Sequence, residues 1–172
     1  IERLAKQLGV HPPVIFQDLG SAHIAQGGIE RSAESLVPSL TVNELVGEAE
    51  WDRKTYFVIC RTLVTLRREY LVTAVQPNHK SLGHALDAMA ELTRAREGAP
   101  VSKTATALAR ALEAATLEQA KALMRKLSPD KRTGHDMVRR WTHASSMTAN
   151  RIALWIGGDL LSGLQAVDEL GL

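Results

Sequence analysis

The stretch YFVICRTLVTLRRE, residues 56–69, decides the fold that the sequence predicts. Its apolar residues recur three and four positions apart, as Ile59 and Leu63 do, which is typical of a helix buried on most of its sides. Three polar side chains interrupt that pattern: Arg61, Thr62 and Thr65. A helix buried all round would carry Ala or Leu at these positions, so the three side chains need an explanation of their own.

The composition is that of an ordinary soluble globular protein. The 172 residues are 45% hydrophobic and 23% charged, with a net charge of +2 at neutral pH. The single cysteine, Cys60, excludes an internal disulfide and any zinc site built from several cysteines. No run of about 18 apolar residues occurs, so we expect no membrane span. The chain opens with neither an initiator Met nor a signal sequence, so we expect a fragment of a longer protein. We also expect a cytoplasmic location.

The N-terminal quarter predicts one short helix and a small antiparallel sheet. The run IERLAKQLG, residues 1–9, is typical of a helix that ends at its glycine. Three strand-like runs follow: residues 14–17 (VIFQ), 22–26 (AHIAQ) and 40–42 (LTV). Gly27 and Gly28 are expected to close the second run in a turn.

Helices are expected from Trp51 almost to the end of the chain. The predicted ranges are residues 51–74, 79–97, 103–115, 120–127, 136–156 and a last helix after Asp159. The expected N-terminal caps are Ser102, a capping box at Thr116, Ser128 and Asp159. The long helix carries one stripe: Val138, Trp141, Ser145, Thr148, Ile152 and Trp155. The sequence therefore predicts an α+β fold, predominantly α-helical, with about five or six helices after the sheet and a single domain over residues 1–172.

Motifs for catalysis or metal binding are scarce. The chain has no GxSxG nucleophile elbow and no GxxxxGK[ST] phosphate loop. None of its six histidines forms the i, i+4 pair with an intervening Glu that a helical zinc site uses. We therefore expect no cofactor and no metal.

Basic residues gather in the second half of the chain: Lys121, Arg125, Lys126, Lys131, Arg132, Arg139 and Arg140. This set is a candidate surface for nucleic acid, whose affinity for the protein would then fall steeply with salt. However, Glu118 and Asp130 lie among these residues, and no aromatic side chains for base stacking alternate with them. A solvated helix face is the simpler interpretation.

The order of the predicted helices and strands along the chain also resembles that of a known protein family. A small early sheet, a buried central helix, and a late helix carrying SMTANRIALWIGGD at residues 146–159 resemble a zincin metallopeptidase domain. The pattern is most similar to the gluzincins of the HtpX and CaaX prenyl protease type. AHIAQGG and SLTVNELV also resemble segments of that family. The resemblance covers most of the chain as an order of elements and a hydrophobic pattern.

The resemblance implies where a zinc site would lie. The family's HExxH motif corresponds to RTLVT, with Arg61 and Thr65 at the two histidine positions and Thr62 at that of the general base. The family's ExxAD motif corresponds to SMTAN, with Ser146 at the third ligand position and Asn150 at that of the Asp. A guanidinium has no free lone pair at neutral pH and would repel a metal cation. If the correspondence holds, the zinc site has been lost.

Three functional hypotheses follow. The first is a non-catalytic pseudo-peptidase that binds a protein or peptide, and the second is the nucleic-acid-binding helical domain. The third is a metallopeptidase with relocated ligands, in which His143 works with His79 or His84. Beside all three stands a purely structural explanation, in which Arg61 extends its stem across the core and reaches water or a carboxylate at its tip, while Thr62 and Thr65 bond to carbonyls one turn earlier. The sequence does not specify an oligomeric state.

Overall fold

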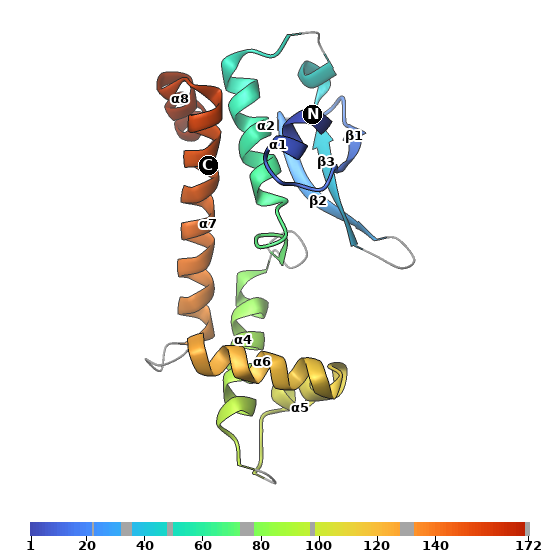
Figure 1. The fold of residues 1–172 in the computed structure, drawn as a ribbon, viewed down its shortest axis with the longest axis vertical. Helices are drawn as coiled ribbons and strands as arrows, with labels where there is room; N and C mark the ends of the chain where they lie inside the picture. Colours follow the sequence, from blue (N-terminus) through green and yellow to red (C-terminus); the bar gives the residue numbers. More distant parts are fainter. Residues whose placement is uncertain are drawn as a thin grey trace. The chain divides into compact units, whose positions relative to one another are not determined.

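The structure is a computed structural model that describes residues 1–21, 23–31, 36–47, 50–72, 78–96, 99–127 and 133–170 (Figure 1). Its contacts group the chain into two compact units, the first formed by residues 1–77 and 143–172 and the second by residues 78–142. The sequence predicted a single domain over residues 1–172, and this remains a prediction, since compact units defined by contacts need not be separate domains.

The first unit contains a mixed three-stranded sheet. The strands are β1 (Val14–Gln17), β2 (Ala25–Arg31) and β3 (Leu36–Val42), in the order β1-β3-β2. The β2–β3 pair is antiparallel as expected, whereas β1 runs parallel to β3, with Val14 opposite Ser39. Two parallel strands need a longer connection than a hairpin, and the connection between β1 and β3 contains β2.

The glycine pair lies inside β2, where the sequence predicted a turn. A Cβ on Gly27 would lie 3.0 Å from Cδ2 of Leu66 and 3.4 Å from Cγ2 of Thr62. The strand therefore runs so close to the central helix that only a residue without a side chain fits there. Gly27 closes the gap between strand and helix and does not end the strand.

The central helix α2 (Arg53–Thr65) begins at an unpredicted cap and ends earlier than expected. The Asp52 carboxylate accepts a bond of 2.6 Å from the N–H of Thr55. Hydrogen bonding from the Thr55 side chain, and secondly from this N–H, lowers the Asp52 pKa. At the other end, the Thr65 hydroxyl donates to the Thr62 carbonyl, which is the acceptor that the Leu66 N–H would use in a continuing helix. The Leu66 N–H bonds to Leu63 instead, and tight turns replace the predicted helix over residues 66–71, while residues 73 and 74 of that prediction lie outside the described residues.

The core of the first unit surrounds α2. Phe57, Ile59 and Leu63 are at most 2% exposed, and they pack with Leu40 of β3 and with Leu4 of the short helix α1 (Glu2–Gln7). As predicted, α1 stops before Gly9, whose φ of 67° suits a glycine. A 3₁₀ helix, η1 (Glu44–Gly47), links the sheet to α2.

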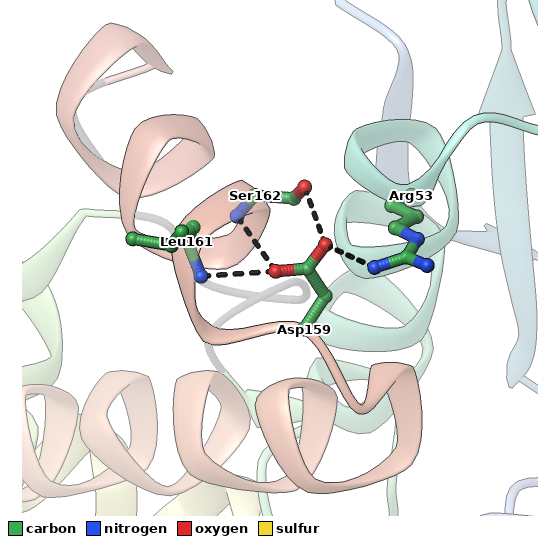
Figure 2. A network of polar contacts seen from close by, with 4 residues as sticks. All are labelled: Arg53, Asp159, Leu161 and Ser162. Carbon is green, nitrogen blue, oxygen red and sulfur yellow. Dashed lines mark hydrogen bonds and ion pairs between the residues drawn. The ribbon is translucent and has the colours of Figure 1, made fainter.

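Two C-terminal helices complete this unit, α7 (Gly134–Gly157), of which residues 143–157 belong here, and α8 (Leu160–Leu170). Ala149 and Ala153 are the fully buried residues of that part of α7, whereas Trp155 is 85% exposed, so the expected stripe is wrong at its end. Figure 2 shows the predicted cap of α8, in which the Asp159 carboxylate accepts from the N–H groups of Leu161 and Ser162. Arg53 of α2 donates to the same carboxylate at 2.7 Å.

The second unit is helical, with α4 (His79–Arg94), α5 (Lys103–Ala111), α6 (Ala114–Leu127) and the first residues of α7. Its core is small and includes Met89, Ala90 and Met124. Ser102 caps α5 as predicted, and Asn78 caps α4. The capping box at Thr116 is wrong because α6 has already begun at Ala114. The cap expected at Ser128 lies outside the described residues.

Backbones meet closely in this unit. The N–H of Gly134 donates to the Asp87 carboxylate at 2.5 Å, and a Cβ on Gly134 would collide with the carbonyl oxygen of Gly83. A Cβ on Gly83 would in turn lie 3.0 Å from Cα of His135. The start of α7 therefore rests on α4 through two glycines.

The predicted fold class is confirmed, because six helices, α2 and α4–α8, follow the sheet in the part of the chain that the structure describes. Among these described helices, none combines the length and the apolar character that crossing a membrane requires.

Candidate functional site

The candidate site is the polar contact between α2 and α7 that contains Arg61. The Nε of Arg61 donates to Oδ1 of Asn150 over 2.6 Å, and its Nη2 donates to Oγ of Ser146 over 3.2 Å. Ser146 and Asn150 are four residues apart in α7 and therefore share a face of that helix. The structure thus brings together three of the five predicted site residues: Arg61, Ser146 and Asn150. In the sequence, Arg61 is separated from Ser146 by 85 positions and from Asn150 by 89.

The Arg61 side chain is half-buried, and its partners are neutral. Among the described residues, no carboxylate lies within ion-pair distance of its guanidinium. Burial lowers the pKa of Arg61 from its ordinary value, because removing water disfavours the charged form. A guanidinium keeps its proton in proteins, so the group carries its charge at neutral pH. The site is therefore a positive centre to which the described part of the chain brings no negative partner.

The two threonines do not join this cluster. The buried Thr62 hydroxyl donates to the Val58 carbonyl over 2.8 Å, and the Thr65 hydroxyl donates to the Thr62 carbonyl over 2.7 Å. Both bonds are the local ones that the structural explanation predicted, and that explanation is confirmed for these two residues. For Arg61 the tip reaches an amide and a hydroxyl, where the structural explanation expected water or a carboxylate.

The predicted basic surface belongs to the second unit. Lys121 donates to Glu118 at 2.8 Å, and Arg139 lies 4.0 Å from Asp136, so two of the cations have acidic neighbours. Arg125, Lys126 and Arg140 are exposed, and Lys131 and Arg132 lie outside the described residues. The nucleic-acid hypothesis stays a prediction, and the absence of binding at low salt would contradict it.

Other reactive groups offer little chemistry. Cys60 is fully buried, and desolvation raises the pKa of its thiol to about 11, which keeps it protonated and unreactive at neutral pH. Within the described ranges, no three side chains of His, Cys, Asp or Glu are grouped so that they could share a metal ion. His143 belongs to the first unit and His79 and His84 to the second, so the relocated-ligand hypothesis stays a prediction.

One feature of the first unit was missed at the sequence level. Strand β1 lies at an edge of the sheet, and its apolar side chains are exposed on both faces: Val14 43%, Ile15 43% and Phe16 42%. Four residues, VIFQ, are too short for the alternation of polar and apolar residues that would have indicated a half-buried strand. Exposed apolar edges are places where another extended chain can pair.

Comparison of the chain with known protein families, curated proteins and solved structures finds no match. The resemblance to gluzincins therefore rests on the sequence pattern.

Proposed function

We propose that this chain is a non-catalytic pseudo-peptidase domain that binds a protein or peptide partner. The observation that carries the proposal is the contact of Arg61 with Ser146 and Asn150. These are the positions at which the resemblance places one histidine ligand, the third ligand and the Asp of a gluzincin. Their proximity supports the proposed ancestry, because a gluzincin-like site requires these positions on the two helices to lie close together.

The chemistry of the cluster argues against hydrolysis at this place. A metal-bound water needs ligands with free lone pairs and a nearby general base. Here the guanidinium occupies the centre, and the oxygens of Ser146 and Asn150 accept its N–H groups. The hydroxyl of Thr62, at the position of the base, is directed to a carbonyl of its own helix. We therefore propose that the domain is not an enzyme.

The surface that we propose for the partner is the outer edge of β1, which pairs with no further strand among the described residues. Its outer backbone groups can extend the sheet by one strand of an added peptide, and its exposed apolar side chains, Val14, Ile15 and Phe16, can contact the side chains of that peptide. Main-chain hydrogen bonds would supply affinity, while the side chains of β1 would supply selectivity. An extended apolar peptide segment is the partner that fits such an edge. A cytoplasmic location belongs to this proposal.

A displayed library of random peptides tests the proposal. We expect selected peptides to bind the unmodified chain and to lose at least about tenfold in affinity on Ile15→Asp combined with Phe16→Asp, which corresponds to about 1.4 kcal/mol. Trp155→Ser is the matched control, because it removes an exposed apolar side chain of the same unit away from the sheet. A library without binders, or binders insensitive to the β1 substitutions, would contradict the proposal.

A further inference from the structure

Among the described residues, the guanidinium of Arg61 makes its hydrogen bonds through one of its edges. An arginine carries five N–H donors in a planar fork. The edge formed by Nε and Nη2 is occupied by Asn150 and Ser146. The described residues offer Nη1 no hydrogen-bond partner. Among these residues, the buried side-chain atoms that lack a partner are Oδ1 of Asn43 and Nε of Arg67, so Nη1 of Arg61 is not a buried atom of this kind. The Nη1 atom of Arg61 is therefore accessible to solvent.

This arrangement fixes an open pair of donors. The two bonds to α7 hold the plane of the guanidinium, so the edge formed by Nη1 and Nη2 projects with a defined orientation. Two parallel N–H groups match the two oxygens of a carboxylate, and a charge-assisted pair of this kind is stronger than a neutral one. Because the fork is already held, little side-chain entropy is lost when a ligand binds.

We propose that this edge of Arg61 binds the carboxylate of a ligand. The half-buried cation has neutral partners and no carboxylate within ion-pair distance among the described residues, so a ligand carboxylate would supply the missing negative charge. A single cation favours a singly charged carboxylate over a phosphate, which proteins usually hold with several cations. The inference goes beyond the proposed function, because it requires neither strand addition to β1 nor peptidase ancestry.

Nitrogen-15 NMR of the arginine Nε–H groups tests the inference in the intact chain. Arg61→Lys assigns the Arg61 signal, which is then followed during a titration with sodium acetate at constant ionic strength. We expect a saturable shift of the Arg61 signal. The matched control within the same spectrum is Arg151, which is exposed and follows Asn150 in α7. An Arg61 signal that moves no more than that of Arg151 would overturn the inference.

Asn150→Asp provides a second, independent arm. This isosteric change places a carboxylate at the acceptor that now lies 2.6 Å from Nε, so it neutralises Arg61 from within and preserves the fold. We expect the acetate affinity to fall at least about tenfold, a change of about 1.4 kcal/mol. Undiminished acetate binding by the folded Asn150→Asp chain would overturn the inference.

The same titration distinguishes two sources of the carboxylate. A short acetylated peptide with a free C-terminus is compared with its C-terminal amide and with acetate. Tighter binding of the free peptide than of acetate, and none of the amide, assigns the site to peptide C-termini. Equal binding of acetate and the free peptide assigns it to small carboxylic acids. The absence of a response to all three would overturn the inference.

Discussion

The bond between Arg61 and Asn150 should contribute measurably to the stability of the first unit. A double-mutant cycle with Arg61→Met and Asn150→Ala isolates that contribution from the separate effects of each change. Methionine keeps much of the length of the arginine stem and can fill the same path across the core. Alanine removes the acceptor but keeps a helix-forming residue within α7.

The structure sets the size of the effect. A hydrogen bond to a charged group contributes about 1.5–3 kcal/mol, and 2.6 Å between Nε and Oδ1 is a favourable distance. Arg61 is only half-buried, so water can replace part of the lost bond in the Asn150→Ala chain. We therefore expect a coupling free energy of about 1–2 kcal/mol.

Urea denaturation of the four chains measures this energy, provided that the slope of the free energy against urea is the same in all. In thermal melts, each kcal/mol should appear as about 2–4 °C for a chain of this size. A coupling below about 0.3 kcal/mol, within the usual additivity of independent sites, would refute the view that the two residues act together.

Three further predictions follow from other contacts. Gly134→Ala should destabilise the chain by about 2 kcal/mol or more, since its Cβ meets the backbone of Gly83, whereas Gly157→Ala, with Tyr56 Cδ1 3.9 Å away, should cost little in urea melts. The bonds from Arg53 and Ser162 lower the pKa of Asp159 from 3.8 to about 2. The unfolded chain therefore binds the proton first, and the stabilisation present above about pH 4 is lost as the pH falls toward 2. The melting temperature should change less with pH across this range for Asp159→Asn than for the unmodified chain. An equal fall of the melting temperature in both chains would contradict the role of the Asp159 cap. After exposure to zinc and removal of the excess, mass spectrometry should find far less than one zinc per chain. One zinc that disappears on His143→Ala would instead support relocated ligands.

Local signals predicted much of the fold. The caps at Ser102 and Asp159 follow from side chains that accept backbone N–H groups, and such bonds need no knowledge of the rest of the chain. The end of the stripe on α7 was wrong for a geometric reason. Steps of three and four residues follow a period of 3.5, whereas an α-helix turns about 100° per residue, which leaves Trp155 about 100° away from Val138.

Long-range approach was harder to predict. A glycine pair is an ordinary turn signal, and only the proximity of Leu66 and Thr62 explains why Gly27 lies within a strand. The cluster of Arg61, Ser146 and Asn150 could be expected only through the family resemblance, because no local pattern relates residues so far apart. The bonds of Thr62 and Thr65 followed from general side-chain chemistry, while the particular partners of Arg61 depended on how α7 packs.

The buried thiol of Cys60 is a built-in probe for transient opening of the first unit. It is the single cysteine of the sequence, it is 0% exposed, and it lies in the middle of α2, where the sheet and both C-terminal helices depend on the same core. A thiol reagent can modify it only when that core separates, so the rate of labelling measures how often the first unit opens. The natural sequence thus permits every variant above to be compared for local opening without adding a probe.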